Sequence, residues 1–300
     1  MTVGAGFAWD AVLCTKMVRF NTVFRGRALG ARSSVSMTEK PATGLYDPAF
    51  DRDSCGFGLI ANLDDQASHF VVETAIAALA RLTHRGAVAA DGRTGDGCGL
   101  LIKFPETFFR AIGSELGFEL SERFAAGTIF LSQDDKLAAA VREEIEAAVR
   151  SCDLEVAGWR EVPIDPEVCG DMALNSLPRI EQVFVNAPAG MQRGTFNRQL
   201  FFARRRAERR FVSIDESAYV ASLSAATVSY KGMGMPQALP DVYPVLRVPR
   251  MDASVCRVHQ RFSATPLAEW RLAQPFRFLA HNGEINTIQG NRNWAIARAD

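Results

Sequence analysis

The order of apolar segments predicts an α+β fold built on antiparallel sheets rather than a doubly wound parallel sheet. Helical patterns occur in the first half of the chain, and strand-like runs follow one another closely in the second half. A parallel sheet would instead need a helix between each pair of neighbouring strands. The 300-residue chain is 48% apolar and 23% charged, which is sufficient to bury a sizeable core.

Strand and helix signals alternate from Cys55 onward. The apolar run 59–61 follows a glycine-rich start and predicts a buried strand, and 100–104 and 128–131 predict two more. Ser68 is the expected N-cap of a helix whose apolar residues recur every 3.6 positions, with Gly86 at its end. A second helix is predicted over 136–150, with Leu137, Val141, Ile145 and Ala148 on one face.

Strand-like runs return in the second half of the chain. They lie at 183–185, 211–214, 219–223, 227–230, 255–259 and 276–280. The arginine-rich stretch 204–210 lies among them and could be a phosphate site, but Glu208 interrupts it. We interpret it as a solvated helix face.

Composition excludes several classes of function. The 34 basic residues balance the 34 acidic ones, so there is no electrostatic basis for a nucleic-acid or membrane-surface partner. No apolar stretch approaches the ~20 residues of a membrane helix. The six cysteines and four histidines lack the spacing of a metal site or a disulfide framework, so we expect no metal within these residues and a reducing, cytoplasmic location.

The first 36 residues are basic and poor in acidic side chains. Five lysines and arginines accompany the single acidic residue Asp10. Two explanations stay open: a start codon assigned too early, with Met37 as the favoured true start, or an organellar transit peptide.

Two regions carry residues suited to chemistry. Cys55 stands at the head of the first predicted strand between small neighbours, where it is either a packed thiol or an accessible nucleophile. The glycine-rich stretch 91–99 lacks the pattern of a phosphate loop and is expected to form tight turns. Near the C-terminus, Asn282 and Gly283 form either a simple turn or the amide and backbone N–H pair of an oxyanion hole.

The combination of motifs is more specific than its parts. In chain order the motifs are Cys55-Gly56, His84-Arg85-Gly86, Thr94-Gly95-Asp96-Gly97, Tyr230-Lys231-Gly232-Met233, His259-Gln260-Arg261-Phe262-Ser263, Leu272-Ala273-Gln274-Pro275-Phe276-Arg277, His281-Asn282-Gly283-Glu284-Ile285-Asn286-Thr287 and Gly290-Asn291-Arg292-Asn293-Trp294. From about Gly44 to its last residue, the sequence resembles the class II glutamine amidotransferase domain of the glutamate synthase large-subunit family.

The resemblance implies an N-terminal-nucleophile hydrolase fold, which is a four-layer αββα sandwich with antiparallel sheets. It implies that residues 1–54 are a leader that is removed, and that 55–300 is the amidotransferase domain. The domain is expected to be incomplete at the C-terminus, because the chain stops before an acidic residue that the family uses on the substrate amino group. Residues 264–266 also depart from the family's usual Thr-Asn-Thr.

The resemblance further implies the roles of individual residues. Cys55 is the expected nucleophile, and its freed α-amino group is the general base. Asn282 and Gly283 would stabilise the oxyanion, while Arg261 would bind the α-carboxylate of glutamine through a planar two-pronged contact. Arg85 is expected to orient groups near the nucleophile.

For the full-length family member the resemblance implies an oxidoreductase that adds ammonia reductively to 2-oxoglutarate. FMN, an iron–sulfur cluster, a synthase region of the same polypeptide and a small reductase subunit belong to that expectation, and none of the cofactors falls on these residues. The electron donor and the oligomeric state stay open. Two alternatives also stay open: a different class II amidotransferase, or a non-catalytic fragment.

Overall fold

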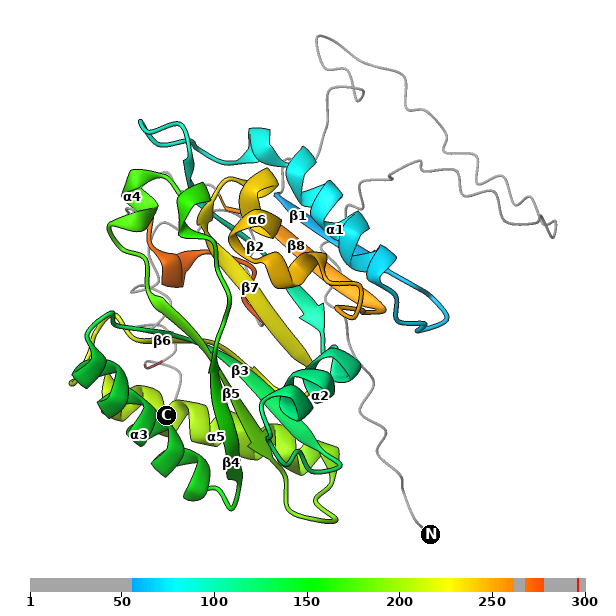
Figure 1. Ribbon diagram of the computed structural model, residues 1–300, viewed down its shortest axis with the longest axis vertical. Coiled ribbons are helices and arrows are strands. Elements are labelled where there is room, and N and C mark those ends of the chain that lie inside the picture. The colour runs from blue at the N-terminus through cyan, green and yellow to red at the C-terminus, as the bar shows by residue number, and fades with distance from the viewer. Residues whose placement is uncertain (1–55, 262–267, 278–295, 297–300) are drawn as a thin grey trace, which may run out of the picture. The chain divides into compact units, whose positions relative to one another are not determined.

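The computed structural model describes residues 56–261, 268–277 and 296, which form two four-stranded antiparallel sheets with helices (Figure 1). The first sheet has the strand order β1-β8-β2-β7 and the second has the order β4-β5-β3-β6. All the strand pairs in both sheets are antiparallel. The predicted α+β class with antiparallel sheets is therefore confirmed.

The first sheet packs against helix α1 (His69–Arg81). Its strands are β1 (Phe57–Ala61), β2 (Thr94–Lys103), β7 (Thr227–Gly234) and β8 (Val255–Gln260). The α1 side chains Val72, Ala75 and Leu79 are fully buried, as their helical spacing predicts. Ser68 is the N-cap residue, but its side chain makes no capping hydrogen bond.

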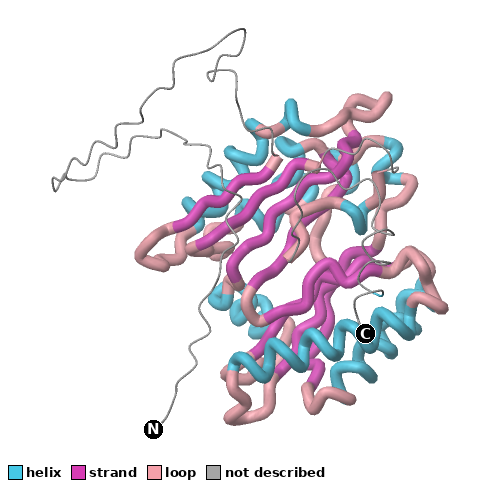
Figure 2. The backbone as a smooth tube through the Cα atoms, turned by 180° about the vertical axis from the view of Figure 1, so that it is seen from behind, coloured by secondary structure: helices cyan, strands magenta, loops and turns pink. Residues whose placement is uncertain are grey.

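The second sheet is covered on its outer face by α3 (Asp135–Arg150) and α5 (Arg193–Phe211). Its strands are β3 (Phe124–Leu131), β4 (Glu155–Glu161), β5 (Arg179–Asn186) and β6 (Tyr219–Ser224). Alternate residues of β3 point to opposite faces, so Ala125 and Ile129 pack against these helices while Phe124 and Phe130 join the core on the other side. The same inner core contains side chains of the first sheet. The layers therefore run helix, sheet, sheet, helix, as Figure 2 shows from behind.

Helix α2 (Glu106–Glu115) closes one end of the inner core. Its Phe108 and Phe109 are buried, and Phe109 packs edge-on against Phe184 of β5. The remaining described elements are short: η2 (Thr83–Arg85), η3 (Pro166–Val168), α4 (Asp171–Leu174), η4 (Pro236–Ala238), α6 (Leu239–Val242), η5 (Pro244–Arg247) and η6 (Trp270–Leu272).

Several predicted elements are wrong or incomplete. The expected strand 211–214 does not form, because Phe211 ends helix α5 and buries its ring against the helical side of the second sheet. In the expected strand 276–280, Phe276 and Arg277 are not in a strand, and 278–280 lie outside the described residues. Helix α1 ends at Arg81, before Gly86, whose backbone is extended. Leu137 on α3 is 37% exposed, and its neighbour Ala138 is buried instead.

The arginine-rich stretch is confirmed as a helix face. It lies on α5, where Arg204 and Arg205 both pair with Glu208, the former at 2.7 Å. Arg210 pairs with Glu144 of α3 at 3.4 Å. These arginines therefore form ion pairs within α5 and between α5 and α3, and do not form an anion site.

In the glycine-rich stretch 91–99, predicted as tight turns, residues 91–93 do form a turn, but 94–99 form the first half of β2. Its glycines allow the segment 268–277 to cross the sheet at close range, beside β7 (orange-red in Figure 1). A Cβ on Gly97 would lie 2.8 Å from Cα of Ala273, and one on Gly99 would lie 2.8 Å from the carbonyl oxygen of Gln274. Gly97 also has φ +117°, which favours glycine. The glycines of β2 therefore allow the backbone of 273–274 to pack directly against the strand.

We expect Gly97→Ala to lower the free energy of unfolding by at least about 2 kcal/mol, because it combines backbone strain with a collision at Ala273. Gly92→Ala is the matched control, since Gly92 also has positive φ but no atom within 4 Å of its built Cβ. Urea denaturation of both variants measures the difference. Equal losses would show that Ala273 moves aside at no cost.

Candidate functional site

Three strand ends meet at one end of the first sheet. The backbone N–H of Gln260, at the end of β8, donates to the carbonyl of Gly56, just before β1, at 2.6 Å. The next N–H, of Arg261, donates to the carbonyl of Gly97 in β2 at 2.8 Å. Gly56 directly follows Cys55 in the sequence, so these bonds place the start of β1 beside Arg261 and the 94–97 motif.

The loop that carries Arg85 reaches the same end of the sheet. A Cβ on Gly86 would overlap the side-chain amide of Gln260 and lie 3.1 Å from the carbonyl oxygen of Arg261. Ala87 N–H donates to the carboxylate of Asp96 at 3.4 Å. The half-buried Arg85 ends the 3-10 turn η2 immediately before this contact. The motifs near positions 56, 86, 97 and 261 are thus brought together although they are distant in sequence.

The side chain of Arg261 is held in place by the backbone of β2. Its side chain is 9% exposed, and its Nη1 donates to the carbonyl oxygen of Asp96 at 3.0 Å. Burial lowers the pKa of the Arg261 guanidinium, whereas Asp96 and Glu269 raise it. Arginine stays protonated in such a setting, so the site end of the first sheet carries a fixed, preorganised cation with several N–H donors.

The described cysteines are unsuited to nucleophilic chemistry. Cys98, Cys152, Cys169 and Cys256 are all buried. Burial raises the pKa of the Cys98 thiol to about 12, and it also raises the pKa values of Cys169 and Cys256. A thiol in this state supplies almost no thiolate at neutral pH. Cys98 instead donates a weak hydrogen bond to the carbonyl of Gly234 at 3.4 Å.

Three of the predicted site residues, Cys55, Asn282 and Gly283, lie outside the described residues. Arg261 and Arg85 are described, and the structure brings their chain segments together. The sequence did not single out Asp96 as a support for Arg261. Its place in the Thr94-Gly95-Asp96-Gly97 motif was the available signal, but a carbonyl contact of this kind has no residue-type signature.

Metal and membrane functions find no support in the described part of the chain. Within it, no three His, Cys, Asp or Glu side chains lie close enough together to hold a metal ion. None of its helices is both long and apolar enough to cross a membrane.

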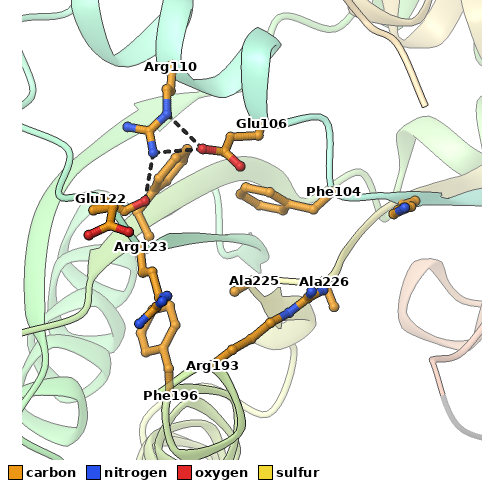
Figure 3. A pocket seen from close by; sticks show the side chains of 11 residues that line it. Phe104, Glu106, Arg110, Glu122, Arg123, Arg193, Phe196, Ala225 and Ala226 are labelled. Carbon is orange, nitrogen blue, oxygen red and sulfur yellow. Dashed lines mark hydrogen bonds and ion pairs between the residues drawn. The ribbon is translucent and has the colours of Figure 1, made fainter. Parts of the chain in front are cut away.

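A separate pocket of about 480 Å³ lies at the opposite end of β2 (Figure 3). Its lining includes Lys103 and Phe104 at the end of β2, and Arg193 and Phe196 at the start of α5. Arg110 in the pocket wall forms an ion pair with Glu106 at 2.7 Å. It also donates hydrogen bonds to the carbonyl oxygens of residues 121 and 122. The pocket shares no lining residue with the site end of the first sheet.

Comparison with known proteins agrees with the arrangement of the motifs. The profile of the family described as "Glutamine amidotransferases class-II" matches residues 55–300. The chain is 37% identical over 258 residues to the glutamate synthase [NADPH] large chain of Bacillus subtilis, covering 86% of this chain and 17% of that protein. It is 37% identical over 277 residues to the chloroplastic ferredoxin-dependent glutamate synthase 2 of Arabidopsis thaliana, covering 91% of this chain and 17% of that protein.

The yeast glutamate synthase [NADH] of Saccharomyces cerevisiae is 36% identical over 267 residues, which are 85% of this chain and 12% of that protein. The chain thus spans between about an eighth and a sixth of the length of these relatives. The profile match covers most of the chain and starts at the residue predicted to be the nucleophile. The chain belongs to the class-II glutamine amidotransferase family.

Proposed function

We propose that this chain hydrolyses glutamine to glutamate and ammonia, using Cys55 as its nucleophile. The observation that carries the proposal is the meeting of the start of β1, the Arg85 loop and Arg261 at one end of the first sheet. Family membership supports the same reaction, because the matched region begins at Cys55. The burial of the described cysteines supports Cys55 further by removing its competitors.

The proposed chemistry needs a freed N-terminus at Cys55, so residues 1–54 would be removed as a leader. The α-amino group has an ordinary pKa of about 7.7–8.0 and accepts the thiol proton near neutral pH. The sulfur then attacks the side-chain amide carbon of glutamine, and the resulting oxyanion is stabilised by Asn282 and the Gly283 N–H. The amide nitrogen takes up the proton and leaves as ammonia. Water then attacks the thioester, which releases glutamate and restores the thiol.

Arg261 is proposed to bind the α-carboxylate of glutamine. One guanidinium nitrogen is held by the Asp96 carbonyl, which fixes the orientation of the planar group before substrate arrives. A carboxylate accepts two parallel hydrogen bonds from such a plane. Arg85 is proposed to orient groups near Cys55, because Gly86 beside it lies against the Gln260 side chain and the Arg261 carbonyl oxygen.

For the whole protein we propose a glutamate synthase, an oxidoreductase in which the released ammonia is added to 2-oxoglutarate. This proposal is supported by the three relatives, which are all glutamate synthases, and by the small share of their length that this chain spans. FMN, an iron–sulfur cluster and a small reductase subunit would then belong to parts of the protein beyond these residues. We propose a cytoplasmic location; the chloroplastic relative keeps an organellar one as the alternative.

The nucleophile is tested by a pair of cysteine variants. We expect Cys55→Ala to abolish ammonia release from glutamine, because the four described cysteines are all buried and a buried thiol does not reach the substrate. Cys98→Ala is the matched control and should retain most of the activity, since Cys98 is a packing residue. Coupled detection of ammonia measures both variants. Activity in Cys55→Ala would show that the nucleophile lies elsewhere.

The leader is tested by intact-mass analysis of the purified active protein. We expect its first residue to be Cys55, because a free α-amino group is the proposed base. Cys55→Ala should keep its leader if removal is autocatalytic. An active protein that retains Ser54 would contradict this role of the α-amino group.

The binding role of Arg261 is tested by Arg261→Lys. We expect the KM for glutamine to rise by about tenfold or more while kcat changes little, because a point charge replaces a two-pronged contact. Arg179→Lys is the control, since Arg179 lies on β5 of the other sheet and pairs with Asp135 of α3. A fall in kcat at unchanged KM would assign Arg261 to the transition state instead.

A further inference from the structure

Lys231 on β7 is a buried cation without a carboxylate partner among the described residues. Its side chain is 1% exposed, and no ion pair within the described part of the chain includes it. Burying an ammonium group costs considerable free energy unless the charge is compensated. A residue of this kind in a strand interior calls for a reason other than core packing.

The ammonium group is compensated by the segment 268–277 that crosses the sheet. Its Nζ donates to the carbonyl oxygens of Arg271 at 2.9 Å and Ala273 at 2.8 Å. It also lies 4.5 Å from the ring centre of Phe276 and 4.7 Å from that of Tyr219, a favourable cation–π geometry. Three of these four contacts are to the crossing segment.

This crossing segment packs onto the strand that supports Arg261. Ala273 approaches Gly97 so closely that a Cβ on Gly97 would lie 2.8 Å from its Cα. The carbonyl of Gly97 accepts the N–H of Arg261, and the carbonyl of Asp96 accepts its Nη1. A displacement of Ala273 would therefore move Gly97, and with it the carbonyl groups that bind Arg261.

We propose that Lys231 is a positioning residue for the glutamine site. Its hydrogen bonds hold the 271–273 backbone against β7, which keeps Ala273 packed on Gly97. This packing in turn fixes the carbonyl groups that orient Arg261. Lys231 touches neither substrate nor reacting atoms in this role. The positioning function rests on the proposed glutamine hydrolysis, whereas the attachment of the crossing segment stands without it.

The attachment has a pH dependence whose sign follows from burial. Burial, reinforced by Arg204, lowers the pKa of Lys231 from 10.5 to about 7. Opening of the segment would solvate the amine and return its pKa towards 10.5, so the open form binds the proton more tightly. Acid therefore favours the open form. The titratable and charged groups around Lys231 are Arg204 and Glu208 of α5, Tyr219 of β6, Tyr243 after α6, and Arg271 and Arg277 of the crossing segment.

The test compares Lys231→Met with Lys103→Met, which alters a lysine of the neighbouring strand that pairs with Asp65. At pH 8, where the lysine is mostly neutral, we expect amide exchange in 268–277 to be at least about tenfold faster in Lys231→Met than in the wild type, because the Arg271 and Ala273 carbonyls lose their donor. The same variant should raise the KM for glutamine about tenfold with kcat nearly unchanged. Lys103→Met should change neither quantity.

The wild-type chain gives a second measurement that needs no variant. As the pH falls from 8 to 6, exchange in 268–277, corrected for the intrinsic rate, should become about tenfold faster. Unchanged exchange in Lys231→Met, or a flat pH profile in the wild type, would overturn the attachment. Faster exchange with an unchanged KM would overturn the positioning role. If the wild type released no ammonia from glutamine, the proposed function would fail and the positioning role with it, while the exchange data would still decide the attachment.

Discussion

The close crossing of one backbone over another at the start of β2 is the constraint on which the site end of the structure depends. Gly97 and Gly99 leave room for Ala273 and Gln274, and no residue with a side chain fits there without displacement. The same stretch of β2 offers the carbonyls that receive Arg261. The lack of side chains at Gly97 and Gly99 therefore determines where Arg261 lies.

The polar groups around this crossing are satisfied mainly by the backbone. Lys231, Arg257 and Arg261 all donate to carbonyl oxygens, on the crossing segment or on β2. These carbonyl oxygens orient the three side chains, and the acidic residues Asp96 and Glu269 also act on the guanidinium of Arg261.

Much of the fold could be predicted from the sequence, and the limits have physical reasons. The spacing of Val72, Ala75 and Leu79 predicted α1 correctly, because burial on one face gives a helical period. The run 211–214 looked like a strand because three of its four residues are apolar, yet Phe211 is the last buried residue on the apolar face of α5, which begins at Phe196. Arginines occupy many positions of that helix, so the helical spacing of its apolar residues was not recognised in the sequence. Strand β4 was missed because Arg160 is its one buried residue, so it shows no apolar alternation; helix α2 was missed as well.

The candidate site was only partly accessible to sequence reasoning. Arg261 and Arg85 were found through motifs, since the family resemblance preserves residue types. Gly97 was read as part of a turn, because a glycine that admits a neighbouring backbone looks the same in sequence as one that bends the chain. The support of Arg261 by the Asp96 carbonyl depends on a backbone atom that every residue has. Contacts of that kind become visible only in three dimensions.

The place of β1 in its sheet bears on the proposed cleavage before Cys55. β1 is an edge strand that pairs with β8 on one side only, and its Phe57 and Leu59 side chains are 41% and 57% exposed. Chain that enters a sheet at its edge can be severed without breaking hydrogen bonds between interior strands. After the proposed cleavage, β1 would keep its register through β8, whose last N–H donates to Gly56. The proposed cleavage at this edge is therefore compatible with a domain that has already folded.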